Sequence, residues 1–213
     1  MDFTFWDILR NLLLAARWTV LLSIVAFIGG GVIGLCILLA RVSSRPWLRR
    51  SAELYIGLFQ GTPLLMQLFL VFFGLPLLGL RIEPWSAAVG GLTLCASAFL
   101  AEIWRGGVES ISLGQWDAAK SLGLHYFQEM RLVILPQAFR ITRAPMVGFL
   151  VQMVKSTAVT SIIGYEELMR AANAINNATF EPFTVYGLVA LLYFAMCFPL
   201  TRYARYLQLR TSS

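Results

Sequence analysis

Long runs of residues without any charge are the feature of this sequence that most constrains its fold. Four windows lack Asp, Glu, Lys and Arg: 23 residues between Arg17 and Arg41, 27 between Glu53 and Arg81, 18 between Glu83 and Glu102, and 20 between Glu181 and Arg202. About 20 apolar helical residues cross the ~30 Å hydrocarbon core of a bilayer. The windows therefore predict four transmembrane helices.

The composition excludes several other classes of protein. Apolar residues make up 58% of the 213 residues and charged residues 13%, about half of the usual ~25%. A disordered chain or a nucleic-acid-binding protein needs more charge. The three cysteines, Cys36, Cys95 and Cys197, are scattered in apolar runs, without the spacing of a disulfide scaffold or a metal site, and are expected to be small buried or lipid-facing residues.

A fifth transmembrane helix is predicted between Pro145 and Gly164, where Lys155 near the middle is the one charged residue. Only with this crossing do the positive charges sort to one side, as the retention of Lys and Arg in the cytoplasm requires. With the N-terminus outside, twelve of the seventeen positive residues fall in inside segments. We expect an all-α integral membrane protein with five transmembrane helices, the N-terminus outside and the C-terminus inside.

Two further patterns concern the organisation of the helices. Residues 1–17 mix charged and large apolar side chains, which is typical of an amphipathic helix in the membrane interface. Residues 18–213 are expected to form a single transmembrane domain. Within it the pairs Gly30/Gly34 and Gly57/Gly61 have the GxxxG spacing that lets two helices approach closely.

The segment 102–143 is 42 residues long and is expected in the cytoplasm, where a loop of this length usually has a function. Ser112 and Gln115 have the spacing of a capping box, which predicts a helix over about 113–122. Gly123 is suited to end that helix in the left-handed conformation.

A second short helix is predicted from about Tyr126, with an interruption at Pro136. The two helices would form a rigid hairpin presented to the cytoplasm. The single histidine, His125, precedes the second helix and is expected to be structural or exposed, because no catalytic partners surround it in the sequence.

The first of these helices carries a recognisable motif. Asp117-Ala118-Ala119 is followed after three residues by Gly123, and Val133-x-Leu135-Pro136 begins nine residues later. This pattern resembles the EAA loop of ABC importer permeases, with Asp117 in place of glutamate and Val133 in place of isoleucine. The spacing matches throughout.

Three other segments resemble the polar amino acid subfamily of these permeases. Residues 59–67 (FQGTPLLMQ) are similar to its FRGTPLLVQ segment, with Gln60 in place of arginine. Residues 101–107 (AEIWRGG) are similar to AEIxRGG, and residues 154–164 (VKSTAVTSIIG) to KxTSLxSxIG. Four motifs in the right order identify the chain as a member of the family of ABC importer permease subunits.

The resemblance implies a type I permease fold and a defined set of partners. Residues 18–213 would be the permease domain, moving a polar amino acid from the periplasm or exterior across the bacterial inner membrane into the cytoplasm. A second permease chain, identical or related, two ABC ATPase subunits, and a periplasmic or lipid-anchored amino acid binding protein are implied. ATP and Mg²⁺ would bind to the ATPase, and no cofactor is expected on this chain. The chain is not expected to be an enzyme itself, because neither of its Lys-Ser pairs is preceded by the glycine that a P-loop requires.

By the same resemblance, the EAA helix couples the chain to the ATPase. Docking is assigned to Asp117, Ala118 and Ala119, with Trp116 and Leu122 as flanking anchors. The hinge is assigned to Gly123, and the end of the return helix to Leu135 and Pro136.

The substrate pathway is less defined. A charge in the middle of a span usually faces the bundle interior with a partner, so Lys155 either meets the substrate carboxylate or forms a fixed ion pair with Glu102 or snorkels to an interface. Glu102 is a further candidate for the route, and Gln67, Ser156 and Thr157 either line it or make helix-to-helix hydrogen bonds.

Two alternatives remain on the residues alone. Glu166 and Glu167 lie just outside, either in a solvated loop or in contact with the binding protein. The alternative function is a stand-alone secondary transporter or channel, although such proteins typically carry several intramembrane acids or repeats.

Overall fold

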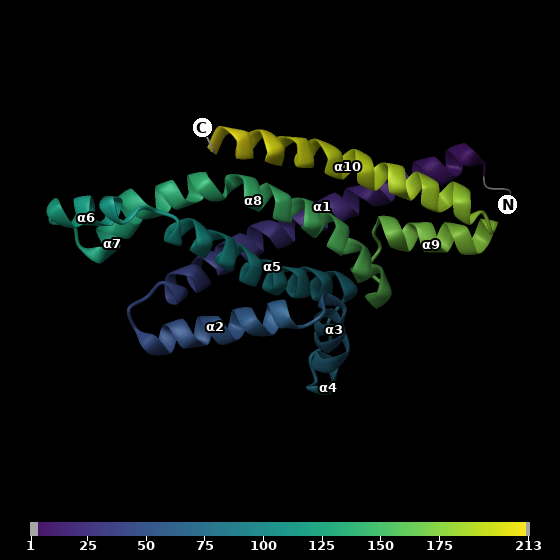
Figure 1. Cartoon of the computed structure of the whole chain (residues 1–213). Coiled ribbons are helices and arrows are strands. Elements are labelled where there is room, and N and C mark those ends of the chain that lie inside the picture. The colour runs from purple at the N-terminus through teal and green to yellow at the C-terminus, as the bar shows by residue number, and fades with distance from the viewer. Residues whose placement is uncertain (1–3, 212–213) are drawn as a thin grey trace.

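The computed structural model describes residues 4–211, and every regular element in that range is a helix (Figure 1). The first, α1 (Phe5–Arg41), is 37 residues long and begins with a capping box between Thr4 and Asp7. At about 1.5 Å per residue it is much longer than a bilayer core is thick. The predicted interfacial segment and the first span belong to one uninterrupted helix, because α1 continues past residue 17 without a break.

The second predicted span is broken. Helix α2 (Pro46–Gly61) is followed by α3 (Leu64–Phe69), a π-helical stretch (Leu70–Gly74) and α4 (Leu75–Leu77), and the two parts meet at a bend of 104°. Pro63 explains the bend: proline supplies no N–H and pushes the residue before it, Thr62, into an extended conformation. The described residues thus contain four helices long and apolar enough to cross a membrane, or five spans when the bent pair is counted as one.

Helix α5 (Pro84–Glu109) packs along α1 in the centre of the bundle (Figure 1). The first predicted glycine pair makes this contact: a methyl group on Gly30 would lie 2.5 Å from Cβ of Ala96, and one on Gly34 would lie 2.9 Å from the Ser97 carbonyl oxygen. That prediction is confirmed. The second pair does not pack within the described chain, since a methyl group on Gly57 or Gly61 would meet nothing within 4 Å.

Helix α6 (Leu113–Ser121) and the one-turn helix α7 (Tyr126–Gln128) come next. From Tyr126 a π-helical stretch (Glu129–Ile134), α8 (Leu135–Ser156) and a 3₁₀ stretch (Thr157–Ile163) form one 38-residue helical rod. The predicted interruption at Pro136 is therefore wrong. The rod continues through proline because it changes from π-helical to α-helical geometry directly before Pro136, so the i→i−4 hydrogen bond that proline cannot donate is not needed there.

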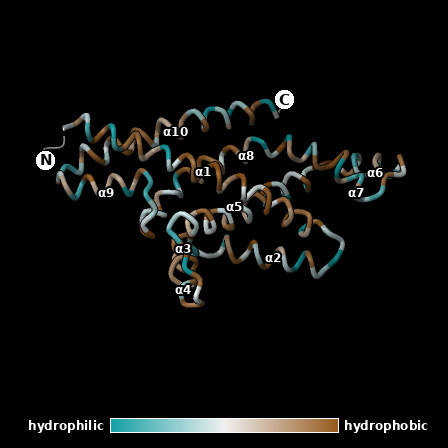
Figure 2. Tube along the Cα trace, turned by 180° about the vertical axis from the view of Figure 1, so that it is seen from behind, coloured by the Kyte–Doolittle hydropathy of each residue, from teal (hydrophilic) through white to brown (hydrophobic). Residues whose placement is uncertain are grey.

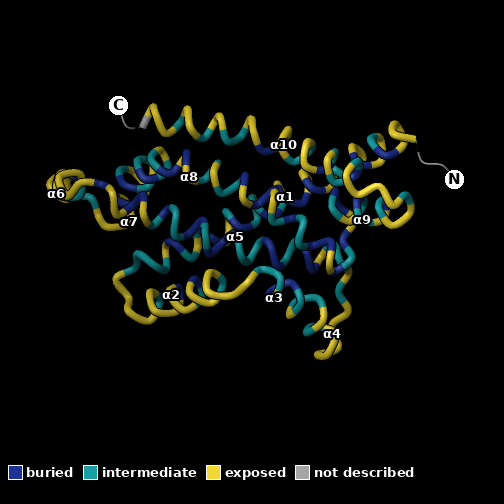
Figure 3. The backbone as a smooth tube through the Cα atoms, turned by 45° about the vertical axis from the view of Figure 1, so that its right-hand side comes forward, coloured by how far each residue is buried: buried dark blue, intermediate teal, exposed yellow. Residues whose placement is uncertain are grey.

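The last two helices are α9 (Leu168–Thr179) and α10 (Pro182–Thr211). Helix α9 was not predicted from the sequence; it lies at the end of the bundle opposite α6 and α7 (Figure 1). Apolar residues predominate in α1 and α5 and in α10 before its more hydrophilic C-terminal part (Figure 2). Buried residues concentrate where α1 packs against α5 and α8 and, towards its N-terminal end, against α9, whereas α10, α4 and α6 expose much of their surface (Figure 3). All three cysteines are free.

Candidate functional site

The α6–α7 hairpin, residues 113–134, extends beyond one end of the helix bundle (Figure 1). Four large apolar side chains on it are mostly exposed: Leu113 (80%), Leu122 (78%), Phe127 (67%) and Leu132 (62%). Exposed apolar residues on a hairpin that extends beyond the bundle are typical of a protein-contact surface. The hairpin therefore has the character of a docking element.

The predicted docking residues divide into two groups. Asp117 and Ala118 are exposed on α6, as is the anchor Leu122. Ala119 is 1% exposed, and Trp116 is half-buried against the apolar cluster of Leu38, Met130 and Ile134. Ala119 faces the chain's own interior and Trp116 is partly exposed, so a contact of these two residues with a partner stays a prediction.

The N-terminal end of α6 differs from the prediction, whereas its C-terminal end agrees with it. The Ser112 side chain makes no capping bond, and the Gln115 Oε1 instead accepts a 3.1 Å hydrogen bond from Nε2 of Gln137 on α8. The predicted capping box is thus wrong, because Gln115 pairs across the hairpin. Gly123 has φ +69°, the left-handed conformation that glycine adopts without strain, so the predicted helix stop is confirmed.

The remaining predicted residues of the hairpin have structural positions. His125 caps α7, and its backbone N–H donates a 3.0 Å hydrogen bond to Oε1 of Gln128. Leu135 is half-buried and Pro136 is exposed at the start of α8, where the hairpin joins the rod.

Gln67 lies at the bend between α2 and α3 and is 8% exposed. Its Nε2 donates to the carbonyl oxygens of Phe59 (2.8 Å) and Thr62 (3.0 Å) and to Oγ1 of Thr62 (3.0 Å). The last carbonyls of a helix have no partner within it. Gln67 therefore stabilises the break in the helix, which matches the hydrogen-bonding interpretation of this residue.

A cavity of about 290 Å³ opens beside the same bend, between α2, α3, α5 and α8. Its walls combine aromatic and aliphatic side chains with two amides and two hydroxyls, and no Asp, Glu, Lys, Arg or His lines it: Phe59, Gln60, Thr62, Leu64, Leu92, Cys95, Phe99, Phe149, Gln152, Met153 and Ser156. Of the predicted pathway residues, Ser156 is the one in this lining. The arrangement suits a small ligand with hydrogen-bonding groups.

The other pathway candidates lie elsewhere. Thr157 is fully buried and its hydroxyl donates a 2.8 Å hydrogen bond to the Val154 carbonyl oxygen, one turn earlier. Lys155 is exposed at the end of α8 and makes no ion pair within residues 4–211. Its side chain is exposed on the described chain, so a contact with the substrate carboxylate and a position near an interface both stay predictions.

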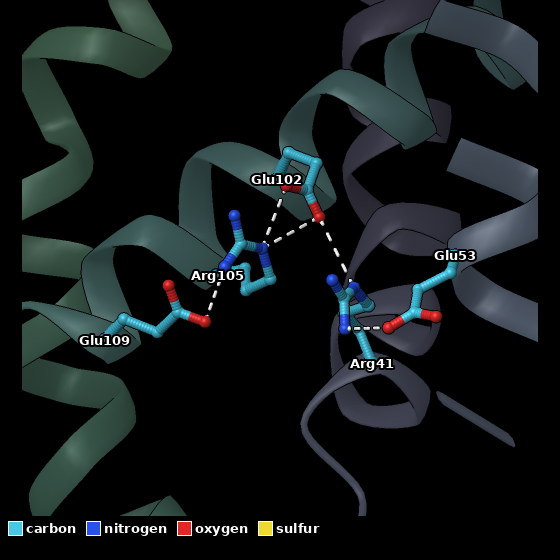
Figure 4. A network of polar contacts seen from close by, with 5 residues as sticks. All are labelled: Arg41, Glu53, Glu102, Arg105 and Glu109. Atoms are coloured by element: carbon cyan, nitrogen blue, oxygen red, sulfur yellow. Dashed lines mark hydrogen bonds and ion pairs between the residues drawn. The ribbon is translucent and has the colours of Figure 1, made fainter. Parts of the chain in front are cut away.

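Glu102 does not pair with Lys155, so the proposed fixed ion pair is wrong. The carboxylate of Glu102 accepts 2.9 Å hydrogen bonds from Nε of Arg105, and it lies 3.7 Å from Nε of Arg41. These contacts belong to a chain of charges over three helices (Figure 4). Sequence reasoning missed this cluster, although the spacing of Glu102, Arg105 and Glu109 on one helix predicts neighbouring side chains.

Glu166 is exposed, whereas Glu167 is completely buried. The Glu167 carboxylate accepts hydrogen bonds from the Arg170 backbone N–H (2.8 Å), the Tyr193 hydroxyl (3.1 Å) and the Thr19 hydroxyl (3.4 Å). A solvated loop is therefore wrong for Glu167, which joins α1, α9 and α10. Burial raises the pKa of its carboxyl group above the ordinary value.

Comparison with known proteins agrees with this geometry. The family described as "Binding-protein-dependent transport system inner membrane component" matches residues 32–213. The chain belongs to this family. It is 42% identical over 180 residues to the probable amino-acid ABC transporter permease protein YckA of Bacillus subtilis (strain 168), covering 84% of this chain and 80% of the relative.

Two further comparisons extend over more of the permease. It is 35% identical over 192 residues to the probable glutamine ABC transporter permease protein GlnM of Bacillus subtilis (strain 168), covering 90% of this chain and 89% of that one. A solved structure described as an amino acid ABC transporter with histidines matches with a TM-score of 0.89 and 32% identity, covering 99% and 100% of the two chains. The chain is thus an amino-acid ABC transporter permease subunit and a multi-pass inner membrane protein.

Proposed function

We propose that this permease imports an amino acid into the cytoplasm, driven by ATP hydrolysis on separate subunits. Two ABC ATPase subunits, which bind ATP and Mg²⁺, would dock against the α6–α7 hairpin of two permease chains, and a binding protein would deliver the substrate at the opposite end. The N-terminus would lie outside and the C-terminus inside, in keeping with the distribution of Lys and Arg.

The observation that carries this proposal is the exposed surface of the α6–α7 hairpin. It projects from the bundle on a rigid rod, and Leu113, Leu122 and Phe127 leave apolar area uncovered beside Asp117 and Ala118. Burying these side chains in a cleft of the ATPase would favour association by about 25 cal/mol for each Å² removed from water. Gly123 would let the hairpin keep its turn while the ATPase subunits close.

For the substrate route we propose the cavity beside the bend of α2 and α3. Because no Asp, Glu, Lys, Arg or His lines it, a substrate side chain with a net charge would be left without a partner there, which is costly in a low-dielectric site. Amide and hydroxyl groups of Gln60, Thr62, Gln152 and Ser156 would hydrogen-bond a polar uncharged side chain. The lining therefore suits a small polar substrate, in keeping with the amino acid that the name of the glutamine permease relative gives.

The test is reconstitution of the permease in liposomes with its ATPase and binding protein. We expect uptake of labelled amino acid that requires ATP and all three components, and no ATP hydrolysis by the permease alone. Replacing Gly123 by valine should preserve ATP hydrolysis while reducing uptake at least tenfold, because a β-branched residue is strained at φ +69°. Gradient-driven uptake by the permease alone would instead support a secondary transporter.

A further inference from the structure

A chain of alternating charges connects three helices near the α6–α7 hairpin (Figure 4). Arg41, the last residue of α1, bonds Glu53 of α2 at 2.7 Å and contacts Glu102 of α5 at 3.7 Å. Arg105 of α5 bonds both Glu102 (2.9 Å) and Glu109 (2.5 Å). The order along the chain is Glu53, Arg41, Glu102, Arg105 and Glu109, so each charge has an opposite neighbour.

The inner members of this chain are shielded from water. The side chains of Arg41, Glu102 and Arg105 are 23–25% exposed, whereas the two ends, Glu53 and Glu109, are 44% and 62% exposed. Isolated surface ion pairs contribute little, but a partly buried network with close contacts constrains how its helices sit relative to one another. Arg41 is the member that joins different helices.

The residue after Arg41 ties this network to the hairpin. The Tyr126 hydroxyl, at the start of α7, donates a 2.8 Å hydrogen bond to the Val42 carbonyl oxygen. A cavity of about 480 Å³ is lined by residues of both groups, among them Arg41 and Arg105 of the network and Leu113, Trp116 and Tyr126 of the hairpin region. The end of α1 therefore touches α2, α5 and the hairpin within two consecutive residues.

One hydrogen-bond donor in this network has no acceptor. Nε of Arg41 is buried and has no hydrogen-bond partner within the described residues, and 3.7 Å to Glu102 is too long for a hydrogen bond. An unpaired buried donor is costly, and native structures keep such groups where another arrangement can satisfy them.

We propose that Arg41 is a positioning residue for coupling. Movement of the α6–α7 hairpin passes through the Tyr126 to Val42 hydrogen bond to the end of α1, and the Arg41 guanidinium transfers it to α2 and α5, which carry the bend and the cavity of the substrate route. This inference rests on the proposed function. It adds that the hairpin acts on the substrate route through α1, and not only along the rod that continues into α8.

The test uses the reconstituted complex and measures ATP hydrolysed per amino acid transported. Arg41→Gln removes the link to α2 and α5, and Tyr126→Phe removes one hydroxyl at an exposed site. We expect each variant to raise the ratio at least threefold while co-purifying normally with the ATPase. Because both act on one path, the double variant should match the more affected single variant. Arg50→Gln and Tyr203→Phe, at exposed positions, are the matched controls.

The outcomes separate cleanly. A wild-type ratio in Tyr126→Phe or in Arg41→Gln overturns the inference, and so does a double variant whose ratio is the product of the two single effects. If Arg41→Gln fails to assemble, Tyr126→Phe alone decides in the same way: a wild-type ratio in that variant overturns the inference. A wild-type complex without ATP-driven uptake would refute the proposed function itself, whereas normal uptake with unchanged ratios would refute this inference alone.

Discussion

The side-chain amide of Gln67 donates a 2.8 Å hydrogen bond to the carbonyl oxygen of Phe59, across the bend between α2 and α3. The same nitrogen reaches both oxygens of Thr62 at 3.0 Å. A glutamate at this position would be of equal size, but an ionised carboxylate only accepts hydrogen bonds and would face three oxygens. We expect Gln67→Glu to lower the free energy of unfolding by about 1–3 kcal/mol.

Thermal unfolding of the purified permease in detergent measures this effect. The control is Gln208→Glu, which makes the same chemical change at an exposed position on α10. Equal melting temperatures for the two variants would show that Gln67 does not stabilise the bend.

The contact between α1 and α5 depends on the absence of a side chain at Gly30. A methyl group there would lie 2.5 Å from Cβ of Ala96, so the helices must move apart to accept alanine. We expect Gly30→Ala to destabilise the chain by about 1–3 kcal/mol, the usual cost of overpacking. Gly57→Ala has open space around the new methyl group and should be neutral or slightly stabilising, because alanine favours a helix.

The melting temperatures of the two alanine variants test this difference. At about 2–4 °C for each kcal/mol in a chain of this size, Gly30→Ala should melt several degrees below Gly57→Ala. A lower melting temperature for Gly57→Ala would contradict the assignment of the two glycine pairs.

Much of this fold could be predicted from the sequence, because the strongest signals are long. The uncharged windows gave the correct spans wherever a helix is continuous, and the Gly30/Gly34 spacing predicted a real helix contact. The bend at Pro63 was missed because a 27-residue uncharged window looks the same whether its helix is straight or folded on itself. Similarly, α9 is short and polar on one face, and no apolar window marks it.

The candidate site was predictable in its motif and not in its side-chain orientations. The spacing of the EAA-like motif locates α6, but only the packing of the hairpin decides that Ala118 faces out and Ala119 in. Glu167 was misjudged for a similar reason. A glutamate shortly after a glycine is typical of a solvated loop. Here the hydroxyls of Thr19 on α1 and Tyr193 on α10 donate hydrogen bonds to the Glu167 carboxylate, and the local sequence gives no sign of these contacts.

The opposite burial of Ala118 and Ala119 gives a third prediction. Ala118→Leu places bulk on the exposed face of α6 and should reduce co-purification of the ATPase at least fivefold without changing the melting temperature of the permease. Ala119→Leu overpacks a residue that is 1% exposed and should destabilise the hairpin itself by about 1–3 kcal/mol. Pull-down of the ATPase combined with thermal unfolding distinguishes the two effects; identical behaviour of the variants would contradict the orientation of α6.

Glu167 predicts a dependence of stability on pH. Burial raises the pKa of its carboxyl group above the ordinary value of 4.5, more than its hydrogen bonds lower it. Between the unfolded and folded pKa values the folded state binds the proton more tightly, so the free energy of unfolding falls as the pH rises through that range. We expect the wild-type chain to gain stability on acidification towards pH 4.5, and Glu167→Gln to lose this part of the slope.

Melting temperatures across that pH range, in one detergent, provide the measurement. The neighbouring carboxylate supplies the control: Glu166 is exposed, so Glu166→Gln should keep the wild-type slope. If the dependence of the melting temperature on pH survives in Glu167→Gln and disappears in Glu166→Gln, the titrating carboxylate is Glu166 and the prediction for Glu167 is wrong.

Lys155 provides the last prediction, because its charge has no ion-pair partner within residues 4–211. A cation in a membrane span costs roughly 2.5–3.5 kcal/mol on insertion scales, so we expect its charge to serve either the substrate or the assembly of the complex. If that contact is the substrate carboxylate, Lys155→Met reduces uptake at least tenfold and leaves assembly of the complex unchanged, while Lys155→Arg keeps part of the activity. If the contact is structural, with the second permease chain, Lys155→Met instead lowers the yield of assembled complex. Uptake and size-exclusion profiles of the same preparations separate the two roles, and wild-type behaviour in both would mean that this charge serves neither.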